Sequence, residues 1–351
     1  LSAEVSSSAY ASQPGDEVLA RAREGVAKLE ATGRGVGPEK IGDLLGGVVD
    51  AIDARSQRKK SPGILIRINA LADLITSWNP GKLYIVGGRP GDGKTAFAAQ
   101  AALQSAEAGY PVLFFSREMM AGELVERNLS HVSRVPAYHI GSGRLSRQDW
   151  TNIQGAGETL RTAPLWYDDR TATIEGIAAT SRKWHALEVR GRKGVSHLGS
   201  DGTPLGLVVL DYLQLARVTK AKSGANREQV VAEMSRTMKD LALELKCPVM
   251  VLSQLNREAE KRGGRPIISD LRESGAIEQD ADVILFVYRD IPPEDVARRR
   301  LPGESELVVG KHRGGPTGIA ETWIDPPLME FRDRDNYRHQ EPDDTRTEPF
   351  N

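Results

Sequence analysis

A glycine-rich segment at residues 88 to 95 has the residue types and spacing of a phosphate-binding loop. It reads Gly-Arg-Pro-Gly-Asp-Gly-Lys-Thr and fits the P-loop pattern G-x-x-x-x-G-K-[ST] in full. Its glycines let successive backbone N–H groups curl around phosphate oxygens, and Lys94 supplies a positive charge for the β- and γ-phosphates. The hydroxyl of Thr95 is suited to bind Mg2+. The predicted nucleotide contacts are Gly88, Pro90, Gly91, Gly93, Lys94, Thr95 and Ala96.

The alternative for this segment is a glycine-rich turn that only joins a strand to a helix. The segment lies between an apolar run that predicts a strand and a stretch that predicts a helix. This is the context that the phosphate-binding mechanism requires, so the complete pattern favours a nucleotide site.

Two carboxylates could complete a site for metal binding and hydrolysis. Asp211 follows the apolar run 207–210, and an acidic residue at the end of a buried strand completes the Mg2+ site of P-loop enzymes. Glu118 follows the run 112–116 and would stand beside Asp211 if the two strands are neighbours, where it could polarise the attacking water. Taken alone, Asp211 is more often a turn or capping residue and Glu118 a solvated charge. The P-loop favours the metal site.

The elements that position these residues alternate between short aliphatic runs and longer helical patterns, which is typical of βαβ units and a parallel sheet. Residues Gln229 to Lys246 have apolar side chains at helical spacing and predict a long helix. The pattern predicts an α/β fold with a central, mostly parallel sheet. The predicted strands are Leu83–Gly87, Pro111–Ser116, Leu165–Asp168, Leu207–Asp211, Pro248–Ser253, Val283–Tyr288 and Leu307–Val309.

The composition divides the chain into four parts. Residues 1–15 are rich in Ser, Ala and Gly and predict a flexible tail. Residues 16–62 contain two amphipathic helical patterns, one starting at Asp16 and one after Pro38, whose apolar faces need a partner surface. Residues 63–338 form the main domain, and residues 339–351 are a polar C-terminal tail. The Gly-rich and basic stretch 187–204 receives no role.

The charge and cysteine content limit the class of protein. Among 351 residues, 47 Lys and Arg oppose 48 Asp and Glu, so any contact with nucleic acid must be local. The single cysteine, Cys247, cannot form an intrachain disulfide, and its apolar neighbours predict a buried strand position. No apolar run is long enough to span a bilayer. We therefore expect a cytoplasmic protein with no membrane contact.

Five further segments, together with the P-loop, resemble the DnaB-type replicative helicases from about Asp16 to Tyr337. This resemblance implies a RecA-like ATPase core that binds ATP or another nucleoside triphosphate with Mg2+. It also implies a homohexamer around single-stranded DNA, with nucleotide between adjacent subunits, that translocates and unwinds duplex DNA. The helix from Asp16 is similar to the linker helix of that family, which packs onto an adjacent subunit. The five segments are Phe114–Met119, Asp211–Leu215, Ser253–Arg257, Asp270–Asp282 and Gly310–Pro316.

The resemblance also assigns roles within the nucleotide site. It makes Glu118 the catalytic carboxylate and Gln254, at the end of a strand, the sensor of the γ-phosphate. Lys311 and Arg313 match the family's basic pair, which reaches the neighbouring subunit's nucleotide and stabilises transition-state charge as an arginine finger does. On sequence alone, Lys-His-Arg after a strand would be a solvated basic turn.

Contacts to DNA are implied for a second set of residues. Arg272, with backbone N–H groups near Glu273 and Gly275, is similar to the family's loop that follows the DNA phosphates. The stretch 217–227 resembles a second channel loop, and an ordinary connector explains it equally well. Six copies of modestly basic loops can line one positive channel, which reconciles DNA binding with a net charge of -1.

Primase and a helicase loader are the remaining partners that the family implies. Because the family's helical N-terminal domain has no counterpart in this sequence, these two partners are expected from the family alone. The rival functions are a RecA/RadA-like recombinase or related oligomeric signalling ATPase, and an adaptor that binds nucleotide without hydrolysis. The segment 270–282 and the basic pair favour the helicase over the recombinase. Retention of Lys94, Glu118 and Asp211 argues against the adaptor.

Overall fold

The computed structural model describes residue 38 and residues 40–56, 63–189, 205–218, 227–271, 274–292 and 295–334. The chain forms two units, Leu1–Lys60 and Ser61–Asn351. In the first unit, helix α3 (Ile41–Ser56) confirms the second predicted amphipathic helix. The two tails, the helix from Asp16 and the stretch 190–204 lie outside the described residues.

The apolar residues of α3 lie in the solvent. The side chains of Ile41, Leu44, Leu45, Val48, Val49 and Ile52 are all between 47% and 80% exposed. An isolated helix of this length is marginally stable in water, because most helical stability in proteins comes from packing an apolar face. The need for a partner surface therefore stays a prediction for α3.

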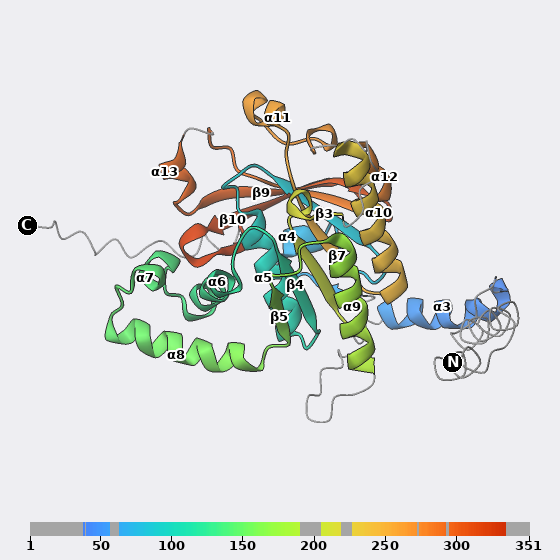
Figure 1. Ribbon diagram of the computed structural model, residues 1–351, viewed down its shortest axis with the longest axis horizontal. Coiled ribbons are helices and arrows are strands. Elements are labelled where there is room, and N and C mark those ends of the chain that lie inside the picture. Colours follow the sequence, from blue (N-terminus) through green and yellow to red (C-terminus); the bar gives the residue numbers. More distant parts are fainter. Residues whose placement is uncertain are drawn as a thin grey trace, which may run out of the picture. The chain divides into compact units, whose positions relative to one another are not determined.

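The second unit is built on a nine-stranded sheet with the order β11-β10-β9-β8-β3-β7-β6-β4-β5 (Figure 1). Strands β8, β3, β7, β6, β4 and β5 are parallel, whereas β9, β10 and β11 join antiparallel. The strands are β3 (Leu83–Gly88), β4 (Val112–Ser116), β5 (Leu165–Asp168), β6 (Leu207–Asp211), β7 (Val249–Gln254), β8 (Val283–Tyr288), β9 (Gly303–His312), β10 (Gly318–Asp325) and β11 (Glu330–Asp333). A small separate sheet pairs β1 (Ile64–Leu65) with β2 (Ser77–Trp78).

All seven predicted strands are present, and two others were missed. The predicted strand at 307–309 is the middle of β9, which runs from 303 to 312. Buried and partly exposed side chains alternate along β9 and β10. Only every second residue there is apolar and buried, so a search for continuous apolar runs finds little of β9 and nothing of β10 or β11.

Helices cover both faces of the sheet, and successive strand residues belong to two separate cores. Tyr84 and Val86 of β3 pack in one core with α5, whereas Leu83 and Ile85 pack in the other with α9 and α10. This burial on both faces explains why the parallel strands are almost continuously apolar. The helices of this unit are α4 (Asn69–Ala72), α5 (Lys94–Glu107), α6 (Ala121–Ser133), α7 (Ala137–Ser142), α8 (Arg147–Thr162), α9 (Ile174–Val189), α10 (Arg227–Leu245), α11 (Arg257–Arg262), α12 (Ser274–Asp280) and α13 (Val296–Arg299).

The predicted helix at 229–246 is confirmed as α10, but the predicted strand position of Cys247 is wrong. Cys247 is fully buried in the turn between α10 and β7. Burial raises the pKa of its thiol to about 12, so this cysteine behaves as a small apolar core residue. No helix in the described parts of the chain is long and apolar enough to cross a membrane.

Candidate nucleotide site

The P-loop joins the end of β3 to the start of α5, as the pattern predicts. Gly91 and Gly93 have φ angles of 81° and 101°, which L side chains rarely adopt. A Cβ at position 93 would also lie 2.8 Å from Cδ1 of Ile324. Lys94 Nζ donates to the carbonyl oxygens of Gly88 at 2.8 Å and Arg89 at 3.3 Å, so the ammonium group lies over the loop.

The start of α5 favours an anion at the same place. Gly93 is the N-cap of this 14-residue helix, and it has no side chain to cap the first N–H groups. The helix dipole adds partial positive charge there, next to the ammonium group of Lys94. This geometry can hold phosphate oxygens.

Asp211 and Thr95 form a set of hard oxygen donors beside the loop. Thr95 Oγ1 donates to Asp211 Oδ2 at 2.8 Å, and Asp211 is 1% exposed. Its second oxygen, Oδ1, is buried and accepts no hydrogen bond from the described residues. Burial raises the pKa of Asp211 to about 6, although the Thr95 hydrogen bond and the charge of Lys94 lower it. A buried carboxylate oxygen without a donor, beside a hydroxyl group, fits Mg2+.

The condition set for Glu118 is met, because β4 and β6 are neighbours. Ser116 is paired with Asp211, and Arg117 N donates to Asp211 O at 2.6 Å. Glu118 is exposed just beyond Ser116. It is close enough to Asp211 that its charge helps to raise the pKa of the aspartate.

Arg127 on α6 is a residue that the sequence reasoning missed. Burial lowers the pKa of its guanidinium group, and the charges of Asp211 and Glu118 oppose this effect. A half-buried arginine near two carboxylates adds positive charge to the site. The only sequence signal was its position, in the helix that starts shortly after Glu118.

Gln254 ends β7 directly beside the P-loop, since the register of β3 and β7 pairs Gly88 with Gln254. A second missed residue, Gln214, fixes the end of this strand. Its Nε2 donates to Ser253 Oγ at 2.9 Å, and its Oε1 accepts from Gln254 N at 3.3 Å.

Two P-loop positions that the pattern leaves variable anchor the loop from below. Arg89 is 3% exposed and donates to the carbonyl oxygens of Ala259 at 3.1 Å and Gly264 at 2.8 Å. Asp92 is fully buried and forms an ion pair with Arg299 of α13. Burial raises the pKa of Asp92, and Arg299 opposes the rise.

Lys311 and Arg313 are not brought to this site within one chain. The register pairs Val283, at the start of β8, with His312, whereas Gly88 is paired with Val287 near the end of β8. The basic pair therefore lies at the opposite end of the sheet, roughly 15 Å from the P-loop along the strands.

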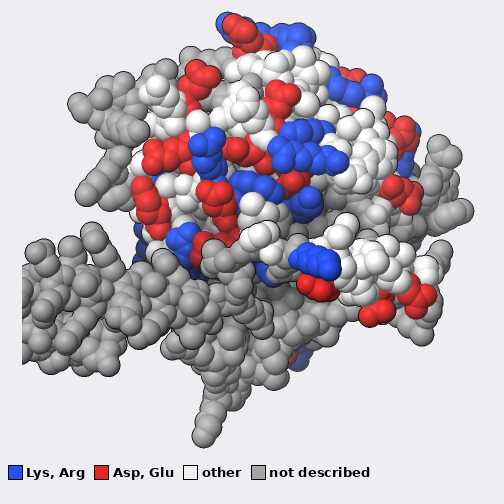
Figure 2. Space-filling view, turned by 90° about the vertical axis from the view of Figure 1, so that its right-hand side faces the viewer, with Lys and Arg blue, Asp and Glu red and all other residues white. Residues whose placement is uncertain are grey.

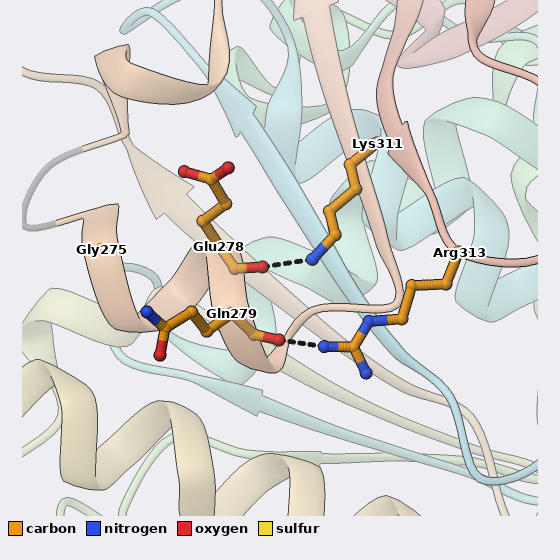
Figure 3. Close-up of a pocket in the computed structure, with 5 residues that line it drawn as sticks. All are labelled: Gly275, Glu278, Gln279, Lys311 and Arg313. Carbon is orange, nitrogen blue, oxygen red and sulfur yellow. Dashed lines mark hydrogen bonds between the residues drawn. The ribbon is translucent and has the colours of Figure 1, made fainter.

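At that opposite end, the basic pair contacts the last turn of α12. Lys311 Nζ donates to Glu278 O, and Arg313 Nη2 donates to Gln279 O (Figure 3). These residues and Gly275 line a hollow of about 530 Å3. Burial and the neighbouring Arg313 lower the pKa of Lys311. Cations at a helix C-terminus are favourable, because the last carbonyl groups lack intrahelical partners.

Of the predicted DNA contacts, only Gly275 can be described. It is exposed in the first turn of α12. Arg272 and Glu273 lie outside the described residues, as does most of the stretch 217–227.

The family model described as DnaB-like helicase C terminal domain matches residues 63–333. The replicative DNA helicase DnaB of Leifsonia xyli subsp. xyli is 38% identical over 289 residues, which cover 81% of this chain and 59% of that protein. DnaB of Buchnera aphidicola subsp. Acyrthosiphon pisum is 36% identical over 312 residues, 88% of this chain and 64% of that protein. The chain thus spans about three fifths of the length of these curated relatives.

Two solved structures share the fold. One is a separately solved ATPase domain, which superposes with a TM-score of 0.71 at 27% identity and covers 85% of this chain and 99% of that chain. A DnaB-like replicative helicase, described with its interactions with primase, superposes with a TM-score of 0.69 at 26% identity. That match covers 90% of this chain and 72% of the other. These likenesses confirm the predicted RecA-like core with a mostly parallel sheet.

We predict that Asp211 makes the metal-free protein less stable as the pH rises. Its folded pKa of about 6 lies above the ordinary value of 3.8, so the native state binds the proton more tightly. The stabilisation is complete below pH 3.8 and is lost as the pH rises through about 6. Between pH 4 and pH 7, the unfolding free energy of Asp211→Asn minus that of the wild type should increase by up to about 3 kcal/mol.

Urea unfolding at each pH, without metal and nucleotide, measures this difference. Asp240→Asn, which changes an exposed aspartate on α10, is the control and should show no such trend. A difference for Asp211→Asn that stays constant with pH would refute the assignment of a raised pKa to this residue.

Proposed function

We propose that this chain, which belongs to the DnaB-like helicase C-terminal domain family, is the motor of a replicative DNA helicase. It hydrolyses ATP with Mg2+, moves along single-stranded DNA and separates duplex DNA as a ring of six copies. Nucleotide binding itself follows from the family's ATPase domain. The ring, the DNA and the identity of the nucleotide and metal are our proposals.

The observation that carries this proposal is the position of the basic pair. A P-loop enzyme needs positive charge at the γ-phosphate during transfer. Lys311 and Arg313 lie at the opposite end of the sheet from their own P-loop. They can serve only the nucleotide of another copy, and a closed ring gives every P-loop such a neighbour.

Each residue of the site has a distinct task in this proposal. Lys94 and the loop N–H groups bind the phosphates, and Thr95 and Asp211 hold Mg2+. The bound metal and ATP supply the phosphoryl group with part of its charge neutralised. Glu118 accepts a proton from the attacking water, and Gln254 responds to the γ-phosphate from the adjacent strand end.

The DNA contacts and the partners rest on the family. Arg272, Glu273 and Gly275 are proposed to follow the DNA phosphates, which suits a motor that must bind every sequence. The exposed apolar face of α3 is proposed to contact an adjacent subunit. Primase is proposed as a partner because a structure with the same fold is described with its interactions with primase. A helicase loader is proposed from the family alone.

DNA-stimulated ATP hydrolysis and strand separation on a forked substrate test the proposed function. Lys94→Ala should abolish both, because it removes the charge that holds the β- and γ-phosphates. The fold should survive, since Lys94 is only half-buried at the surface of the loop. Near wild-type turnover in this variant would overturn the P-loop assignment.

Glu118→Gln should bind nucleotide and assemble normally but lose most turnover, because an amide cannot accept the proton from water. General-base residues contribute on the order of a hundredfold to ten-thousandfold in rate. Glu126→Gln on α6 changes another exposed glutamate and is the matched control. Weaker nucleotide binding with an unchanged rate per bound ATP would exclude Glu118 as the catalytic carboxylate.

Arg313→Ala should bind ATP nearly normally and hydrolyse it on the order of a thousandfold more slowly, as removal of an arginine finger does. Mixed with Lys94→Ala subunits, it should regain hydrolysis although neither variant is active alone. In an equal mixture, about a quarter of the interfaces combine an intact P-loop with an intact Arg313. If subunit exchange is verified and no hydrolysis returns at any ratio, Arg313 does not act across subunits.

A further inference from the structure

Asp282 is a buried carboxylate that the nucleotide chemistry does not use, and it lies beside Arg313. It is 3% exposed and directly precedes β8. Its Oδ2 accepts hydrogen bonds from Leu83 N at 2.9 Å and Lys239 Nζ at 2.6 Å. Its Oδ1 lies 3.5 Å from Lys82 Nζ and 3.8 Å from Arg313 Nη1.

The backbone of Asp282 holds the same arginine. Arg313 N donates to Asp282 O at 2.9 Å, and Asp282 N donates to Leu83 O at 3.0 Å. Asp282 is therefore fixed to β3 through its main chain and side chain, and Arg313 is fixed to Asp282 through both as well. Gln279 O adds a third contact to the guanidinium group (Figure 3).

Asp282 carries a negative charge where positive charges gather. Burial alone would raise its pKa, but the hydrogen bonds from Lys239 and Leu83 N outweigh burial, so the pKa lies below its ordinary value. The side chain of Lys239 is 15% exposed, whereas those of Lys82 and Arg313 are 45% and 47% exposed. Lysine and arginine side chains cluster on this side of the molecule (Figure 2).

The three cations thus have different relations to Asp282. Lys239 is buried and also donates to Gly81 O at 3.0 Å, so its contact belongs to the core. Arg313 is half exposed and is the cation proposed to reach another subunit. A fixed carboxylate near one side of its guanidinium group limits the rotamers of a long side chain, which would otherwise lose entropy at each catalytic encounter.

We infer that Asp282 is the positioning residue of Arg313: its buried carboxylate and its carbonyl oxygen set where the guanidinium group projects toward the neighbouring subunit's nucleotide. This inference rests on the proposed hydrolysis across subunits. Asp282 touches neither nucleotide nor water in this account. Its effect passes through Arg313 alone.

Asp282→Asn tests this role, because the amide is similar in size and its oxygen can still accept from Leu83 N. We expect hydrolysis to fall on the order of tenfold to a hundredfold, as misplacement of a catalytic group does. ATP affinity should be unchanged, since Asp282 lies at the opposite end of β3 from the P-loop. Asp240→Asn, next to Lys239 on α10, is the matched control and should hydrolyse ATP at the wild-type rate.

The decisive readout is rescue by Lys94→Ala subunits, which retain Asp282 and Arg313. At interfaces that join an Asp282→Asn P-loop to a Lys94→Ala basic pair, the rate should return to that of the wild type. General damage to β3 would harm the P-loop of the Asp282→Asn subunit itself, and rescue would then fail. Unchanged hydrolysis in Asp282→Asn, or a loss that Lys94→Ala subunits do not rescue, would overturn the inference.

A second variant keeps the test valid if Asp282→Asn leaves Lys239 buried without a counter-charge and does not fold. Asp282→Asn combined with Lys239→Met removes both charges of the buried pair, which is far less costly than removing one. The same loss and the same rescue are expected, and their absence would again refute the role of Asp282. Failure of Arg313→Ala to be rescued would instead refute hydrolysis across subunits, so the two failures are distinguishable.

Discussion

The direction of the strands in the sheet is the constraint on which the site depends. Six parallel strands bring their carboxyl ends to one edge, and this edge carries the P-loop after β3, Asp211 at the end of β6 and Gln254 at the end of β7. The antiparallel return of β9 sends Lys311 and Arg313 to the other edge. One strand reversal therefore divides the catalytic groups into two sets that a single copy cannot unite.

The nucleotide edge is held in a state that favours function over stability. Asp211 is buried with one oxygen that receives no hydrogen bond from the described residues, and burial raises its pKa. An ionised carboxylate there is costly until a cation neutralises it, so Mg2+ binding would release this cost. Asp92 and Arg89, by contrast, are bound by residues far along the chain and keep the loop in place.

The sequence predicted the edge of the sheet better than its surroundings. Lys94 and Thr95 lie in a contiguous pattern whose backbone geometry is local, and continuous apolar runs predicted the parallel strands. The partners of Arg89 and Asp92 are 170 to 207 residues away, and no local pattern indicates them. Arg127 was missed because a single arginine on an amphipathic helix is normally solvated. Strands β10 and β11 were missed because alternation hides their apolar residues.

The division of the site between copies is the central claim. Electron microscopy of particles assembled with a non-hydrolysable ATP analogue, Mg2+ and single-stranded DNA tests it most directly. The account predicts a closed ring in which each nucleotide contacts Lys94, Thr95 and Asp211 of one copy, with Lys311 and Arg313 of its neighbour at the γ-phosphate. Nucleotide bound at every P-loop with no basic pair of a neighbouring copy within reach would contradict it.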